Sequence, residues 1–455
     1  MNSVKITPIS AYNLYGHFYH RPAPPISSNK VRLTNMSSLD EITTFYAAYQ
    51  RETNIRTALE FIDKLRLAGK AEDAIDLALK WSDKTTEPIA RAQLAYFMSC
   101  LGMFAPAERI LEEVLPQVES DDDTYYQVRL ELAVVKYCLG KFHQAHVLQR
   151  PLYGPRWGEV WSRLSSHNRD NSWFLRHKDK VLYDQPVAGK TILIGAEGGI
   201  GDMLQLSRYV KRLQQEGAAL IYCSAPPALQ SLMVNSGLPI VVVDYATSQM
   251  VECDFFTSFF ALFTRYQQSP YFPVMEEDYL ALSASHVLPG ELQEKLRRHN
   301  SGKRRIGLVW RSETRVRHEP YRSMDLAALA PLLASVDADF FSLQVGALSE
   351  QERMLMAQYR MVDLAPHLQS FEDSAHVLEQ LDLLLSIDSA PAHLAGARKR
   401  PVWLMLARAS DYRWYDCQRF TPWYSSMRLY RQAKLGDWQS VVAAMIASLS
   451  DRDPA

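Results

Sequence analysis

The chain has 455 residues, with 50 basic against 51 acidic side chains and 47% hydrophobic residues. This length exceeds one ordinary domain of about 100–200 residues, so two or three domains are expected. A formal net charge of -1 gives no overall reason to bind nucleic acid or an anionic membrane. The five cysteines are scattered without a CxxC or Cys/His ligand pattern, which indicates neither a disulfide framework nor a zinc site.

The N-terminal segment, residues 1–40, is rich in Pro, Ser and Asn and predicts an irregular arm. It lacks the charged region followed by an apolar run that marks a signal peptide. The longest apolar runs of the chain are far shorter than the ~20 residues that cross a bilayer. We therefore expect a cytoplasmic protein without a transmembrane segment.

Residues 41–152 have helical periodicity and an internal repeat. A Gly-x4-Ala spacing occurs three times, with the glycines 33 and then 38 residues apart, at Gly69/Ala74, Gly102/Ala107 and Gly140/Ala145. Glycine permits the turn of a helical hairpin, and the small alanine lets the second helix approach the first. The pattern resembles the tetratricopeptide repeat, whose period is ~34 residues.

Such an array predicts a concave surface that holds a protein or peptide. The alternative is a divergent helical domain that only packs on its neighbour. Residues 153–190, with Trp157, Trp161 and Trp173 in a polar background, are expected to be a connector.

From residue 191 onward, short apolar runs alternate with helical segments, which predicts parallel sheets with right-handed crossovers. In residues 191–300, strands are expected at 191–195, 218–223 and 240–243, and helices at 203–216 and 229–235. In residues 301–455, strands are expected at 305–310, 340–344, 383–386 and 401–406, and the final helix at 438–449. The predicted class is α/β, with two Rossmann-like units whose strand ends face a common cleft.

The turn after the first strand is rich in glycine and holds two carboxylates, Glu197 and Asp202. No acidic residue ends the second strand and no Gly-Lys-Ser/Thr follows, so neither a dinucleotide fingerprint nor a P-loop is indicated. Exposed N–H groups at a helix start attract an anion, and a carboxylate there suits a general base. The alternative for Asp202 is a simple N-terminal cap.

Basic residues crowd the loop after the first strand of the second unit. These side chains could hold a diphosphate through charge-assisted hydrogen bonds, and they are Arg311, Arg315, Arg317, His318 and Arg322. Few aromatics are interleaved, which makes a nucleic-acid patch the weaker alternative. Farther on, Asp388, Ser389 and His393 follow a strand at another expected helix start.

Several motifs occur in a fixed order. They are Gly-x-Gly-Asp-x-x-Gln at residues 199–205, Gly-Leu-Val-Trp-Arg at 307–311, Arg-Ser at 322–323, Ser-Leu-Gln at 342–344, and Ile-Asp-Ser-x-x-Ala-His-Leu-Ala-Gly at 387–396. With a late Arg-Trp at 413–414, the set resembles bacterial proteins that join tetratricopeptide repeats to a GT-B glycosyltransferase module of the heptosyltransferase-like family 9 type. The resemblance covers roughly residues 60–450.

The resemblance implies roles for individual residues. Asp202 corresponds to the proposed catalytic base, with Glu197 as the second candidate. The residues implied to bind the sugar nucleotide are Gly199, Gly201, Arg311, Arg322, Gln344, Asp388, Ser389 and His393. Ser389 replaces the usual threonine but keeps the hydroxyl, and Ser312-Glu313 replaces the commoner Gly-Asn, so donor specificity cannot be carried over.

The implied reaction is inverting transfer of a sugar from a nucleoside-diphosphate sugar to an acceptor, without a cofactor or metal. The fused repeats favour a protein acceptor such as flagellin or an adhesin. One alternative is a lipopolysaccharide or oligosaccharide acceptor. A second is a non-catalytic repeat scaffold with a degenerate sugar-nucleotide site, and a third is an epimerase-like enzyme.

Overall fold

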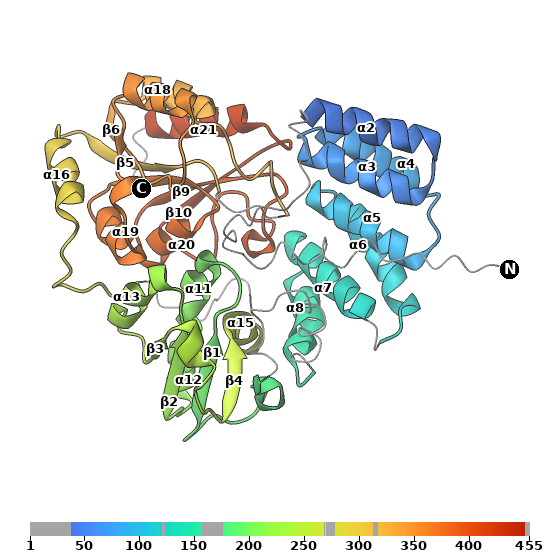
Figure 1. Cartoon of the computed structure of the whole chain (residues 1–455), viewed down its shortest axis with the longest axis horizontal. Coiled ribbons are helices and arrows are strands. Elements are labelled where there is room, and N and C mark those ends of the chain that lie inside the picture. The colour runs from blue at the N-terminus through green and yellow to red at the C-terminus, as the bar shows by residue number, and fades with distance from the viewer. Residues whose placement is uncertain are drawn as a thin grey trace, which may run out of the picture.

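The computed structural model describes residues 38–120, 123–156, 176–267, 269, 278–312 and 317–450. Most of the predicted N-terminal arm, the three connector tryptophans and Arg315 lie outside these residues. Two α/β halves are stacked at the left of Figure 1, and a staircase of helices runs beside them. None of the helices in the described ranges is long and apolar enough for a bilayer crossing.

The helical staircase consists of three hairpins that follow a first helix. Helix α2 spans Ser38–Arg51, and the hairpins pair α3 (Ile55–Leu67) with α4 (Ala71–Ser82), α5 (Pro88–Cys100) with α6 (Phe104–Val114), and α7 (Asp123–Cys138) with α8 (Phe142–Gln149). The three repeat glycines lie in the hairpin turns with φ of 75°, 75° and 70°, and the three repeat alanines are fully buried. The helical hairpins are thus confirmed, while their assignment as tetratricopeptide repeats stays a prediction.

The first α/β half has four parallel strands in the order β3-β2-β1-β4. They are β1 (Thr191–Gly195), β2 (Leu220–Ser224), β3 (Val241–Val243) and β4 (Phe255–Ser258), of which β4 was not predicted. Its helices are α11 (Ile200–Leu206), α12 (Val210–Gln215), α13 (Pro227–Asn235), α14 (Tyr245–Ser248) and α15 (Phe259–Tyr266).

The single helix predicted at 203–216 is wrong in detail. Helix α11 begins three residues earlier, and a short 3-10 turn at Ser207–Tyr209 separates it from α12. Asp202 therefore lies inside the first turn of α11, where it caps the helix.

The second half has six parallel strands in the order β10-β9-β8-β5-β6-β7. They are β5 (Arg304–Val309), β6 (Ala338–Ser342), β7 (Val362–Asp363), β8 (Leu383–Ile387), β9 (Val402–Leu406) and β10 (Met427–Arg431), and β7 and β10 were not predicted. Its helices are α16 (Gly290–Arg298), α17 (Ala330–Ser335), α18 (Glu350–Gln358), α19 (Phe371–Leu378), α20 (Ala390–Ala397) and α21 (Trp438–Ser450), which packs on α17 and β10.

When β5 is counted as strand 1, the second sheet read from β7 to β10 has the strand order 3-2-1-4-5-6 of a doubly wound dinucleotide-binding fold. The first sheet has the first four strands of this order, 3-2-1-4. In such sheets ligands bind outside the strand ends at the point where the order reverses. That point lies between β1 and β4 in the first half and between β5 and β8 in the second. The α/β class and the two parallel sheets are confirmed.

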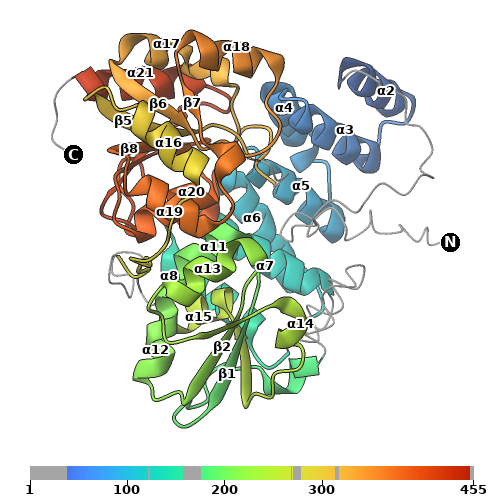
Figure 2. The ribbon, with the colours of Figure 1, turned by 60° about the vertical axis from the view of Figure 1, so that its left-hand side comes forward.

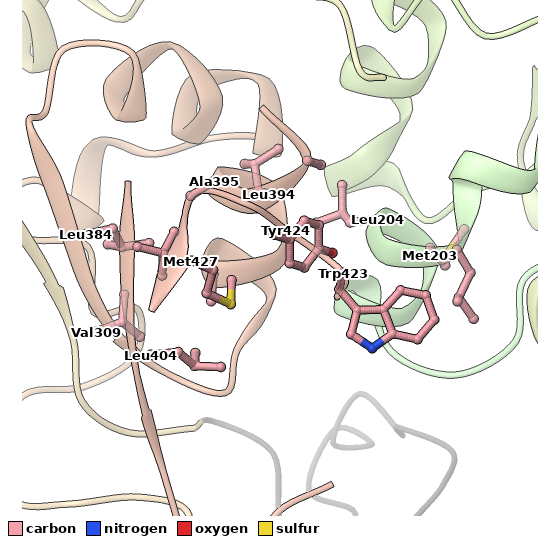
Figure 3. Close-up of a cluster of buried hydrophobic side chains, with 14 of the residues drawn as sticks. Met203, Leu204, Val309, Leu384, Leu394, Ala395, Leu404, Trp423, Tyr424 and Met427 are labelled. Carbon is pink, nitrogen blue, oxygen red and sulfur yellow. The ribbon is translucent and has the colours of Figure 1, made fainter. Parts of the chain in front are cut away.

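Buried contacts join the two halves and the last hairpin. Figure 3 shows Trp423 and Tyr424, from the segment before β10, beside Leu204 and Met203 of α11. One continuous hydrophobic core includes both halves together with residues of α7 and α8, whereas a second core holds α2 to α6 and the opposite face of α7. Figure 2 shows α6 and α7 running beside the two halves.

Candidate active site

A cavity of about 450 Å³ lies between the carboxyl ends of the two sheets. Its walls come from the turn after β1, the loops after β5 and β8, and the last helical hairpin. It falls within the usual volume range of small-molecule sites, about 300–1,000 Å³. All ten residues predicted from the motifs line it or adjoin its turns: Glu197, Gly199, Gly201, Asp202, Arg311, Arg322, Gln344, Asp388, Ser389 and His393.

The Asp202 carboxylate makes two contacts, one with each of its oxygens. One carboxylate oxygen accepts a hydrogen bond of 2.6 Å from the Gly199 amide, as a helix cap does. The other oxygen faces the second half, where it forms an ion pair of 2.6 Å with Arg413. Arg413 follows β9 in the short helical turn Tyr412–Trp414, so this ion pair bridges the two halves across the cavity.

Arg413 is the main functional candidate that the sequence reading did not assign. Its guanidinium also lies 3.4 Å from Asp411, and the two carboxylates outweigh burial and raise its pKa. Burial raises the pKa of Asp411 in turn, because little solvent reaches its carboxyl. Arg413 follows β9, and the ends of neighbouring strands in the same sheet carry predicted site residues. Because the ends of parallel strands share one edge of a sheet, Arg413 could have been predicted on the same ground.

The loop after β8 forms a second cluster. His393 Nε2 lies 3.5 Å from the Asp388 carboxylate, its Nδ1 lies 3.1 Å from the Tyr424 hydroxyl, and its ring stacks on Trp414. Burial acts to raise the pKa of Asp388, but the charge of Arg322 and the hydrogen bond from His393 outweigh it and lower that pKa. Asp388 therefore stays ionised.

Helix α20 points its N-terminus at the cavity. Ser389 is its N-cap residue, and the Ser389 hydroxyl lies 2.8 Å from that of Ser386. Arg322 donates from its Nε to the Asp388 carbonyl at 2.7 Å and lines the cavity. A helix start, a hydroxyl and an arginine together suit an anionic group.

Gly201 lets the two helix starts approach each other. A Cβ atom at Gly201 would lie 2.9 Å from the His393 ring and 3.5 Å from the Ala390 Cα. At Gly198 the backbone has φ +78°, and a Cβ atom would lie 2.5 Å from the Asp202 carboxylate. Both glycines are therefore needed for this packing.

The arginines of the β5 loop divide into two groups. Arg311 stays at the cavity edge, where its Nε lies 3.1 Å from Glu352 and its Nη2 donates to the Ala347 carbonyl at 2.6 Å. Arg317, expected at a diphosphate, also lines the cavity, but it is buried against the helical staircase, where it pairs with Glu131 of α7 at 2.7 Å. His318 is also buried, and this burial lowers its pKa well below the usual value.

Gln344 is buried at the end of β6. Its side-chain carbonyl accepts the backbone amides of Trp310 and Arg311 at 3.1 and 2.9 Å, and its amide donates to Val345. The side chain thus fixes the turn that carries Arg311. Within the described ranges, no group of three or more His, Cys, Asp or Glu side chains is arranged to hold a metal ion.

No family model and no curated protein matches the chain. Among solved structures, it is similar to a family 9 glycosyl transferase of Veillonella parvula, with 13% identity, 58% of this chain and 97% of that chain covered, and a TM-score of 0.42. It is also similar to the ADP-heptose LPS heptosyltransferase II of E. coli, with 16% identity, coverages of 57% and 98%, and a TM-score of 0.38.

A third similar structure, a mutant O-GlcNAc transferase of Thermobaculum terrenum, has 10% identity and a TM-score of 0.25, and the match covers 87% of this chain and 91% of that one. At such low identities and TM-scores, these likenesses establish neither a shared family nor a shared reaction.

Proposed function

We propose that the protein is a glycosyltransferase that moves a sugar from a nucleoside-diphosphate sugar to an acceptor hydroxyl. One observation carries the proposal. The Gly-Asp turn at 199–202 and the Asp388/Ser389/His393 element, nearly two hundred residues apart in the chain, line the same cavity from opposite halves. Both lie at the reversal points of parallel sheets, where ligands of such folds bind.

The donor binds on the second half. The start of α20, the Ser389 hydroxyl and Arg322 hold the diphosphate, while Gln344 fixes the loop that carries Arg311 at the cavity edge. These groups stabilise the negative charge that develops on the leaving diphosphate. In this proposal the arginine and helix start perform the task that a metal ion performs in other transferases.

The acceptor lies on the first half, and Asp202 is its base. The carboxylate takes the proton of the acceptor hydroxyl while the hydroxyl oxygen bonds to sugar C1. The bond between C1 and the phosphate oxygen breaks on the opposite face, its electron pair leaves with the nucleoside diphosphate, and the configuration at C1 inverts. Arg413 orients the Asp202 side chain through their ion pair, and Glu197, buried in the same turn, is the second candidate for the base.

The proposed acceptor is a protein such as flagellin or an adhesin, because the last helical hairpin is itself a wall of the cavity. A lipopolysaccharide or oligosaccharide acceptor is the alternative within the same reaction class. A non-catalytic scaffold would bind nucleotide and turn over no donor.

The test is a panel of nucleoside-diphosphate sugars with the wild-type protein, Asp202→Asn and the exposed control Asp76→Asn. We expect release of nucleoside diphosphate from at least one donor, and a loss of about 10²–10⁴-fold in Asp202→Asn with unchanged nucleotide affinity. Asp76→Asn should behave as wild type. Nucleotide binding without turnover of any donor would instead support the scaffold.

The acceptor is tested in the host. Mass spectrometry of host proteins, with the wild-type gene or the Asp202→Asn allele, should find a protein that loses a sugar. If no protein does, the protein acceptor is wrong even where donor turnover is established.

A further inference from the structure

The last helical hairpin and the short 3-10 turn after it, Arg150–Tyr153, contribute four side chains to the cavity, which we call the array wall: Leu130, Val134, Gln149 and Tyr153. Leu130 and Val134 are one helical turn apart on the same face of α7. Phe260 of the first half also lines the cavity, and its ring lies next to Gly198 in the turn that carries Glu197. Val134, Tyr153 and Phe260 are 5%, 5% and 8% exposed, whereas Leu130 is only half-buried and remains accessible.

We propose that the array wall is an acceptor subsite that binds an apolar side chain of a polypeptide, next to the residue whose hydroxyl is modified. This assignment builds on the proposed function, because it places the subsite beside the base. The binding itself does not require turnover and can be measured alone.

The charges of the cavity favour this occupant. Among the described residues that line the cavity from the helical array and the first half, Glu197 and Asp202 carry carboxylates, and none is a lysine or an arginine. The cationic lining residues belong to the second half, and they are Arg311, Arg317, Arg322 and Arg413. A phosphorylated or carboxylated glycan acceptor would therefore meet like charge on the acceptor side. A neutral segment with an apolar side chain meets no such repulsion and gains from burial against Leu130, Val134 and Phe260.

The array wall is held rigidly at the site. The Tyr137 ring of α7 lies 5.3 Å from that of Tyr412, which directly precedes Arg413, and its hydroxyl donates to Gln149 at 2.8 Å. Glu131, one residue from Leu130, pairs with the buried Arg317 of the second half. The wall is thus fixed to the same segments that hold the proposed base, as a subsite for positioning an acceptor requires.

The test measures binding of end-capped heptapeptides whose central serine is flanked on both sides by leucine or by glutamate. Fluorescence polarisation with the full-length protein, in the presence of ADP, GDP or UDP in turn, gives the dissociation constant of each peptide. We expect the leucine peptide to bind about tenfold more tightly than the glutamate peptide, from the burial of apolar side chains. Leu130→Arg should invert this preference, and Leu130→Ala, a milder change, should narrow it.

Val147→Arg is the matched control, because Val147 is 70% exposed on α8 and does not line the cavity. It should leave the peptide preference unchanged. Equal binding of the leucine and glutamate peptides, an unchanged preference in both Leu130 variants, or binding of a neutral oligosaccharide or polyprenol but of no peptide would each overturn the subsite. The expected preference without transfer of any sugar would support the subsite and refute the proposed transferase.

Discussion

At the scale of single residues, the site depends on how closely two helix starts approach. The α11 and α20 N-termini meet at Gly201, where no side chain fits against His393 without a shift of neighbouring atoms. This closeness lets Asp202 of one half and the Asp388 loop of the other face one cavity.

We therefore expect Gly201→Ala to lower stability by about 1–3 kcal/mol, as overpacking in a close contact does. The helix starts would separate, so nucleotide affinity should also fall by about tenfold. Thermal unfolding and nucleotide titration measure the two effects. Gly290→Ala is the control, since a Cβ atom there meets no atom within 4 Å; a variant at Gly201 that behaves like this control would contradict the packing argument.

Most of the site residues could be predicted from the sequence because they lie in the loops that follow buried strands, and parallel strand ends share one edge. Arg413 escaped because it lies seven residues beyond the end of β9, in a loop without periodicity. The ion pair of Arg317 was not predicted for a related reason. A run of basic residues does not reveal which member turns away to pair with Glu131, a partner distant in the chain.

At the scale of elements, two polar contacts add to the apolar packing that attaches the last hairpin to the α/β halves. The first is the buried Arg317–Glu131 pair between the β5 loop and α7. Removing one partner of a buried pair leaves an uncompensated charge.

Glu131→Gln is thus expected to cost about 3–5 kcal/mol of stability. The double variant Glu131→Leu with Arg317→Met removes both charges and should recover much of this loss. Apparent melting temperatures of the two variants and of the wild type provide the measurement. A double variant less stable than Glu131→Gln would show that the ion pair is not the source of the effect.

The second contact is His146 of α8, whose Nε2 lies 2.9 Å from the Thr264 carbonyl of α15. Burial lowers the pKa of His146 from 6.5 to about 4, so folding favours the neutral ring. Its stabilising contribution is complete above pH 6.5 and is lost as the pH falls from 6.5 towards 4.

At pH 5 this loss amounts to about 2 kcal/mol. Melting temperatures of wild type and His146→Gln between pH 7.5 and about 4.5 should converge as the pH falls. A constant difference between the two proteins over this range would refute a neutral buried His146.

At the scale of the whole molecule, α7 belongs to two cores at once. Val128, Leu132 and Val135 face the outer hairpins, whereas Val134, Tyr137 and Cys138 pack in the core of the α/β halves. The helix is apolar on opposite sides, as buried helices are.

Hydrogen exchange of the intact protein should reveal this division. Amides of α7 are expected to exchange together with β8 and β9, and those of α3 and α4 earlier, because the outer hairpins open without exposing the main core. Exchange of α7 together with α3 would instead mean that the whole staircase opens as one unit.

The sequence predicted the order of helices and the two sheets, because long amphipathic helices and buried apolar strands have a local period. Strands β4, β7 and β10 were missed. β7 has only two residues, and β10 (Met427–Arg431) contains two arginines that interrupt the apolar run by which the other strands were predicted. The sequence also did not predict that α7 packs in two hydrophobic cores. Its two apolar faces are visible in the residues, but their separate partners are set only by the tertiary fold.

The double burial of α7 has a consequence for where an acceptor could be modified. Because α7 cannot swing away from the cavity without opening the main core, the outer hairpins lie at a set separation from the proposed base. An extended polypeptide advances at most about 3.3–3.6 Å per residue, so this separation corresponds to a set number of residues. A polypeptide held by the outer hairpins would then be modified at hydroxyls that lie a defined number of residues from the segment that the hairpins bind. The helical staircase would in this way set the spacing between the bound segment and the modified residue.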